Sequence, residues 1–215
     1  MTDQYRGLED LPEHIAVFPL AGALLFPRWS LPLNIFEPRY LNMIDDAMAS
    51  SRLIGMVQST GGDRACPDLA HIGCVGRITS YSETEDGRYL VSLTGICRFN
   101  IIEELDVSTP YRQVHADWSK YATDFRDSDE GDLPDRSTLT AALRTYSERN
   151  TMEVDWDAVG NAPLETLINA LCAGCPFNVM EKQALLEAET VVDRGDTLIK
   201  LLEMDLPGGE SATLQ

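Results

Sequence analysis

The spacing of the apolar residues changes partway along this chain, from the pattern of strands to that of helices. Up to residue 118 they form short runs divided by glycine and proline, which favours a closed strand barrel over an open sheet. After residue 136 they recur every three to four positions. We expect an α+β protein with a barrel over residues 12–118, an acidic linker over 119–136, a helical subdomain over 137–205 and a flexible tail over 206–215.

The clearest local signal in the first half is a β-hairpin. Two strand-like runs, residues 78–84 and 88–94, flank a turn that contains Asp86-Gly87. Glycine supplies the positive φ that a tight hairpin turn requires. We expect Gly95 to end the second run and a separate strand to cover residues 96–103.

One helix is expected inside the strand-rich half, directly after a proline-rich apolar segment. Pro38 suits a first helical turn, where its missing N–H is no loss. The apolar residues that follow share one helical face: Tyr40, Met43, Ile44, Ala47 and Met48. We expect Phe36 and Met43 to be core residues, so that alanine at either position would leave a cavity.

The second half contains amphipathic helices with recognisable starts. Ser137 or Thr138 is expected to cap the first helix, and Pro163 to open a later one. Asn178 followed by Glu181 predicts a capping box for another.

Acidic residues crowd the segment between the two halves: Asp124, Asp127, Asp129, Glu130, Asp132 and Asp135. A run of like charges interrupted by glycine and proline predicts a solvated, mobile linker.

The overall charge restricts the classes of partner. Lys and Arg number 17 against 35 Asp and Glu, which gives a formal charge of −18. Such a surface repels nucleic-acid phosphates and anionic membranes, and it also favours solubility. No apolar run reaches the roughly 18 residues of a membrane span, and the N-terminus has no signal-peptide pattern. We expect a cytoplasmic protein that binds neither nucleic acid nor membrane.

The cysteines favour buried thiols over a metal or redox centre. Cys172 and Cys175 have the spacing of a metal or redox pair, but a zinc site needs about four ligands and no second cysteine pair exists. Cys172 also falls in the apolar register of its helix, as a core thiol would. The histidines lie far away in the strand-rich half: His14, His71 and His115. We therefore expect no metal and no cofactor.

Motifs of catalysis are absent from the sequence. It contains no Gly-x-Ser-x-Gly elbow, no His-Glu-x-x-His and no phosphate-binding loop. Serine and lysine occur together as neighbours in Ser119-Lys120, next to a loop. We expect no catalytic residues and no enzymatic activity.

Three arginines stand out because basic residues are scarce and these lie in apolar context: Arg39, Arg88 and Arg98. A guanidinium can hold a carboxylate, a carbonyl or a helix end through several hydrogen bonds. A structural role is the expected one for at least two of them. The alternative is that one or more lines a groove in which a partner docks.

Several short motifs occur in a fixed order: Phe18-Pro19-Leu20, residues 31–40, Ile54-Gly55, residues 72–78, residues 86–89, residues 95–99, Pro110-Tyr111-Arg112 and residues 181–187. In this order and spacing the chain resembles the Lon protease N-terminal, substrate-binding domain family over most of residues 12–205. A related domain occurs in cereblon, as a scaffold within a substrate receptor.

The resemblance implies a PUA-like, six-stranded pseudo-barrel with one inserted helix, followed by a helical bundle. Full-length Lon adds an ATPase and a Ser-Lys protease, whereas this sequence ends after the helices. We therefore expect a stand-alone bacterial member of the family.

The main functional hypothesis is a non-catalytic module for unfolded or exposed polypeptide, working with a protease or chaperone in trans. Its proline-rich apolar loops and its arginines suggest a peptide groove. The expected groove residues are Phe26, Trp29, Phe36, Arg39, Arg88 and Arg98. Two alternatives remain: an RNA-binding PUA-like protein, and an enzyme with a pocket between barrel and helices. The sequence does not determine the oligomeric state.

Overall fold

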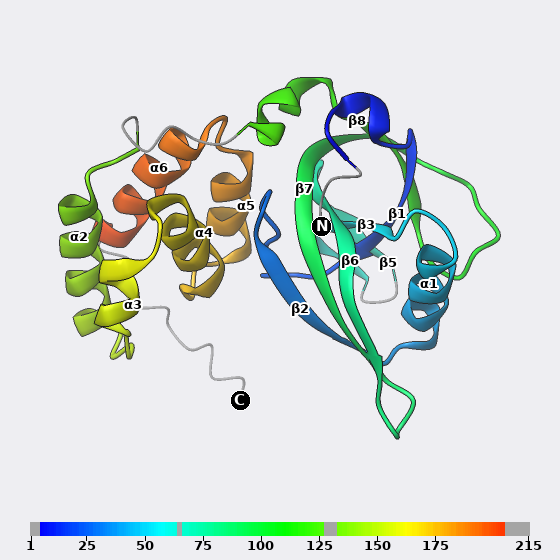
Figure 1. Ribbon diagram of the computed structural model, residues 1–215, viewed down its shortest axis with the longest axis horizontal. Helices are drawn as coiled ribbons and strands as arrows, with labels where there is room; N and C mark the ends of the chain where they lie inside the picture. The colour runs from blue at the N-terminus through cyan, green and yellow to red at the C-terminus, as the bar shows by residue number, and fades with distance from the viewer. Residues whose placement is uncertain (1–4, 64–65, 127–132, 205–215) are drawn as a thin grey trace.

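Six strands form a barrel beside a group of helices in the computed structural model (Figure 1). The structure describes residues 5–63, 66–126 and 133–204. The barrel strands are β1 (His14–Pro19), β2 (Ser30–Ile35), β3 (Leu53–Val57), β6 (Ile72–Glu83), β7 (Tyr89–Glu104) and β8 (Gln113–Asp117). The strands and helices together confirm the α+β class.

The strand order is β2-β7-β6-β3-β1-β8. A further pairing of β7 with β8 closes β7, β6, β3, β1 and β8 into a ring, and β2 extends the sheet beside β7. The long strand β7 makes closure possible because its two ends have different partners. Its first part pairs with β2 over Tyr89–Thr94, and its last part pairs with β8 from Asn100 onward. β1 and β3 are parallel, and the other pairs are antiparallel.

Gly95 lies inside β7, so the prediction that it ends a strand is wrong. The pairing with β6 shifts register beside it, where Gly76 lies opposite Gly95 and Val75 opposite Cys97. A Cβ atom at position 95 would collide with the backbone carbonyl of Phe26. Glycine is therefore needed here for the close approach of another chain segment, and the strand bends and continues.

The expected hairpin is confirmed between β6 and β7, where Gly87 has a φ of 76°. It extends beyond the barrel at the bottom of Figure 1. A second, smaller hairpin joins β4 (Ser59–Asp63) to β5 (Cys66–Leu69).

Helix α1 (Pro38–Met48) covers one side of the barrel, and the later helices lie on the other (Figure 1). Pro38 opens α1, as expected. Its buried face is Tyr40, Met43, Ile44 and Ala47, and Met48 is partly buried against the same core, so the predicted face is confirmed. Phe36 precedes the helix with 62% of its surface exposed, so the prediction that it is a core residue is wrong.

The helical subdomain consists of α2 (Arg136–Arg149), α3 (Trp156–Asn161), α4 (Leu164–Gly174), α5 (Val179–Glu187) and α6 (Val191–Glu203). The capping box of Asn178 and Glu181 at α5 is confirmed. The predicted cap of α2 is wrong: the N-cap is Asp135, two residues before Ser137, and its carboxylate accepts from the Thr138 backbone N–H at 3.1 Å.

The acidic segment is partly ordered. Ser119–Phe125 forms a 3-10 helix, η2, in which Asp124 is buried, so the prediction of a solvated linker is wrong for Asp124. Four of the other acidic residues and the predicted tail lie outside the described residues: Asp127, Asp129, Glu130, Asp132 and residues 206–215.

The contrast between Met43 and Phe36 gives a stability prediction. Met43 is fully buried, so Met43→Ala should lower the free energy of unfolding by about 2–5 kcal/mol through a core cavity. Phe36→Ala should change it by about 0.5 kcal/mol or less, because the ring is largely in water already. Urea denaturation measures both values, and an equal loss for the two variants would contradict this assignment.

Candidate functional site

An open groove of about 1060 Å³ lies where the start of α1 meets the barrel. Four chain segments form it: the end of β1 with the residues after it, the middle of β2, the first turn of α1, and the β4–β5 hairpin. Its lining residues are Phe18, Pro19, Leu20, Ala21, Pro32, Leu33, Asn34, Phe36, Glu37, Arg39, Tyr40, Ser59, Asp63 and Pro67. Most of these side chains are apolar.

The prolines explain why these segments stay extended at the groove. Pro19 ends β1, Pro32 lies in β2, and Pro38 opens α1. Each fixes φ near −65° and removes one backbone donor. β2 pairs with β7 on one side and stands at the end of the strand order, which is where a strand tolerates proline.

Two large apolar side chains at the groove are exposed. Phe36 has 62% and Leu20 37% of its surface in water. The β6–β7 hairpin also comes close to this site: the Arg88 guanidinium, near its tip, lies 6.0 Å from the centre of the Phe36 ring. Exposed apolar side chains gathered at a concave surface are typical of binding sites.

Charged groups line the same groove at the start of α1. The Arg39 guanidinium donates to the Glu37 carboxylate at 2.9 and 3.0 Å and lies 4.6 Å from the centre of the Tyr40 ring. Burial raises the pKa of Tyr40, whose ring packs 4.3 Å from that of Phe18. The groove thus combines an apolar floor with an ion pair at one end.

Arg98 lies elsewhere, in the interior between the barrel and the helices. Only 2% of its side chain is exposed, and it forms a bidentate ion pair with Asp124, with a closest distance of 2.8 Å. The remaining guanidinium hydrogens are donated to the carbonyls of Leu186, Ala188 and Glu189 at the end of α5. The last carbonyls of a helix have no intrahelical hydrogen-bond partners. The Arg98 side chain, which extends from the barrel, therefore caps the C-terminal end of α5.

The other expected groove residues divide between interior and surface. Phe26 is fully buried, and the Arg194 guanidinium stacks 4.3 Å from its ring centre. Trp29 is partly buried against the core. Arg88 is exposed and pairs with Asp86 at 2.8 Å. The groove therefore unites Phe36 and Arg39, with Arg88 beside them, whereas Phe26 and Arg98 are not accessible from it.

Buried polar residues that the sequence did not indicate also join barrel and helices. The Gln58 side chain donates to the Val179 carbonyl and to the Gln183 side chain, both at 3.1 Å, and accepts from the Gly22 N–H. Lys182 donates to the Gly22 carbonyl at 2.8 Å. One signal in the sequence could have indicated Gln58: it is a polar residue that directly follows an apolar run, and this run is the fully buried β3.

The pair Cys172 and Cys175 is buried at the end of α4, and both thiols are free. Burial raises the pKa of Cys172 to about 12 and that of Cys175 to about 11. A reactive cysteine needs a thiolate at neutral pH, so these are inert core thiols.

A six-stranded barrel completed by a helical subdomain, with an open groove beside one helix, defines the class of this α+β domain. Residues 14–204 match the family model described as the ATP-dependent protease La (LON) substrate-binding domain. The chain therefore belongs to the LON substrate-binding domain family. In the described helices, no stretch is long and apolar enough to cross a membrane.

Curated relatives agree with this assignment. A Lon protease of Flavobacterium johnsoniae is 27% identical over 204 residues, which cover 92% of this chain and 25% of the relative. A Lon protease of Parabacteroides distasonis is 28% identical over 210 residues, covering 94% and 25%. The chain thus spans about a quarter of the length of these relatives.

Solved structures support the fold. The N-terminal domain of Mycobacterium avium complex Lon protease has a TM-score of 0.64 at 16% identity and covers 90% of this chain and 100% of its own. A Lon N-terminal domain protein from Xanthomonas campestris has a TM-score of 0.59 at 18% identity, covering 87% and 97%. The relation to cereblon stays a prediction.

The ion pair of Arg98 gives a second prediction. Arg98→Ala leaves the Asp124 carboxylate buried without its partner and should lower the free energy of unfolding by about 3–5 kcal/mol. Arg88→Ala removes one partner of an exposed ion pair and should leave the free energy of unfolding nearly unchanged. Denaturant unfolding tests both, and removing Arg98 and Asp124 together should cost less than the sum of the single changes.

The cysteines give a third prediction. Cys66 is exposed and the other four are buried, so a thiol reagent should modify one cysteine rapidly in the native protein. Cys66→Ser should abolish the fast phase, and unfolding in guanidinium should release the remaining four thiols. Absorbance during reaction with Ellman's reagent measures the count, and fast modification of Cys172 or Cys175 would contradict their assignment as core thiols.

Proposed function

We propose that this domain binds polypeptide segments with exposed apolar side chains and holds them in the groove beside α1 without catalysing a reaction. The observation that carries the proposal is the exposed Phe36 ring at an apolar groove. Family membership supports it, because the matching model describes a substrate-binding domain.

The apolar part of the groove supplies the attraction. Phe36 and Leu20 would lose contact with water when an apolar client side chain packs between them. Removing apolar surface from water gains roughly 25 cal/mol per Å². Burial of apolar surface does not require a particular orientation of the contacting groups. The groove would therefore accept many sequences that share only an apolar side chain. A recognition domain for unfolded chains requires this breadth.

The polar part would orient the client. Glu37 and Arg39 offer an acceptor and donors at the first turn of α1, and Asp63 offers a further carboxylate on the β4–β5 hairpin. Backbone amides and carbonyls of an extended peptide could then be satisfied while its side chains enter the apolar floor.

We further propose that a protease or a chaperone acts on the bound client in trans. Any cleavage of the client's peptide bonds would then take place in the protease, outside residues 14–204. The relatives of which this chain spans a quarter are Lon proteases. Within the described ranges Arg98 is engaged by Asp124 and α5, whereas His115 lies near Glu103, so these groups do not converge on one catalytic pocket.

A polypeptide ligand agrees better with the charge than RNA does. The formal charge of −18 would oppose binding of a phosphate backbone. The cytoplasmic location stays a prediction.

Binding of an unfolded client tests the proposal. Fluorescein-labelled β-casein should bind the purified chain in an anisotropy titration, and Phe36→Ala should weaken binding roughly tenfold because one buried aromatic contact is lost. Ile102→Ala is the matched control, since Ile102 is 56% exposed on β7 and does not line the groove. Equal affinity of the two variants, or no binding by the native chain, would disprove the proposed site.

A further inference from the structure

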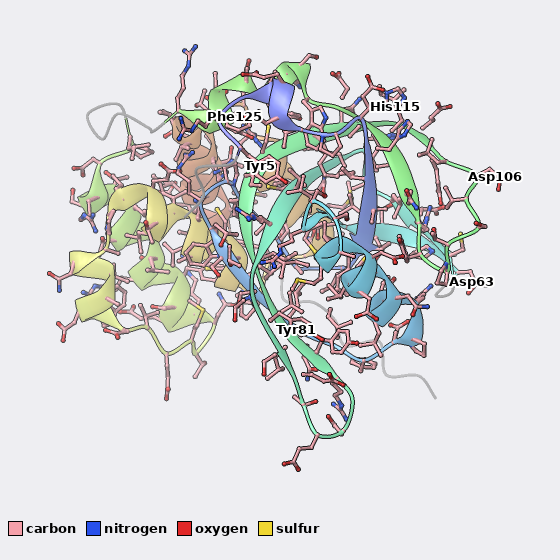
Figure 2. All side chains as sticks on the ribbon, turned by 45° about the vertical axis from the view of Figure 1, so that its right-hand side comes forward. Tyr5, Asp63, Tyr81, Asp106, His115 and Phe125 are labelled. Atoms are coloured by element: carbon pink, nitrogen blue, oxygen red, sulfur yellow. The ribbon has the colours of Figure 1, made fainter. Side chains whose placement is uncertain are left out.

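Two of the three histidines of this chain meet on the outside of the barrel. His14 on β1 lies directly opposite His115 on β8 in the antiparallel pairing. Their ring centroids are 5.3 Å apart, with the planes at 84°. Figure 2 shows His115 at the surface, well separated from Asp63 of the groove.

The pairing pattern explains why the imidazoles are so close. The Ala116 N–H donates to the Glu13 carbonyl and the Val17 N–H to that of Arg112, so these residues form the hydrogen-bonded pairs. His14 and His115 therefore occupy a non-hydrogen-bonded pair, in which Cα atoms approach to about 4.5 Å and side chains come closer together.

Carboxylates complete the cluster. The ligand atoms of Glu13, His14 and His115 all lie within 4.8 Å of one another. On the other side of His115, its pairing partner on β7 is Glu103, whose carboxylate lies 3.8 Å from the imidazole Nδ1. His14, His115 and Glu103 thus come from three adjacent strands, whose backbone pairing fixes their spacing, and Glu13 directly precedes β1.

We propose that His14, His115 and Glu13 bind a divalent transition-metal ion such as Zn²⁺, with water as the fourth ligand. Two imidazole nitrogens with carboxylate oxygens suit Zn²⁺ in a tetrahedral site, and they are less suited to Mg²⁺ or Ca²⁺, which prefer oxygen alone. Because Zn–N distances are about 2.0–2.1 Å, the ligand atoms, which now lie within 4.8 Å of one another, would move closer together on binding. His14, Glu13 and Glu103 are exposed, so an ion can reach the site from solvent.

The position of the cluster gives the metal a structural consequence. β8 pairs with both β1 and β7, and the β7–β8 pairing is the one that closes the barrel. An ion held by His14 of β1, Glu13 before it and His115 of β8 would tie these two strands together next to the closing seam. A metal ion that binds the folded state but not the unfolded state stabilises the folded state. Zn²⁺ should therefore raise the melting temperature of the protein.

Calorimetric titration of ZnCl₂ into the full chain, without a histidine tag or chelator, tests the site. One ion per chain should bind, and His14→Ala and His115→Ala should each weaken binding by at least roughly tenfold. His71→Ala is the matched control, because His71 is exposed and outside the cluster. Cys66→Ser controls for the exposed thiol. Both control variants should bind as the native chain does.

Thermal unfolding with ZnCl₂ gives an independent readout. Zn²⁺ should raise the melting temperature of the native chain and of His71→Ala, but not that of His14→Ala. Three results would overturn the proposal: no binding at millimolar Zn²⁺, binding that survives both cluster substitutions, or equal competition by Mg²⁺, which would indicate attraction to surface carboxylates alone.

Discussion

The hydrogen bonds of the Arg98 guanidinium hold the two halves of this protein together. The side chain extends from β7, pairs with Asp124 of η2 and donates to the carbonyls at the end of α5. Three segments far apart in the chain therefore meet at one buried cation. Because a buried charge without its partners is costly, the barrel, the 3-10 helix and the helical subdomain are stable together in this arrangement.

Other contacts at the same boundary extend this restraint. Gln58 donates to the Val179 carbonyl and Lys182 donates to the Gly22 carbonyl across it. Arg194 of α6 donates to the Leu185 carbonyl and stacks on the Phe26 ring. Hydrogen bonds require particular distances and angles, whereas apolar packing alone tolerates sliding. The polar boundary thus fixes the orientation of the later helices on one side of the barrel, whereas α1 lies on the opposite side (Figure 1). The open groove lies beside the first turn of α1.

Local signals in the sequence predicted the elements well. Asp86-Gly87 predicted the hairpin, Pro38 the start of α1, and Asn178 with Glu181 the cap of α5, since each depends on residues within one turn. Burial was less predictable. Phe36 and Met43 are both apolar, yet one is 62% exposed and the other fully buried, because Phe36 precedes the helix whose inner face carries Met43.

By itself, the sequence determined the α+β class, the family and the strongly acidic net charge, because composition, periodicity and motif order are properties of the chain alone. Tertiary structure decided which side chains form sites. It placed Arg98 and Phe26 in the interior and Phe36 with Arg39 at the groove. It also brought His14 opposite His115, a pairing set by the strand register of β1 and β8. Register depends on how distant segments pack and hydrogen-bond, and neither segment contains that information alone.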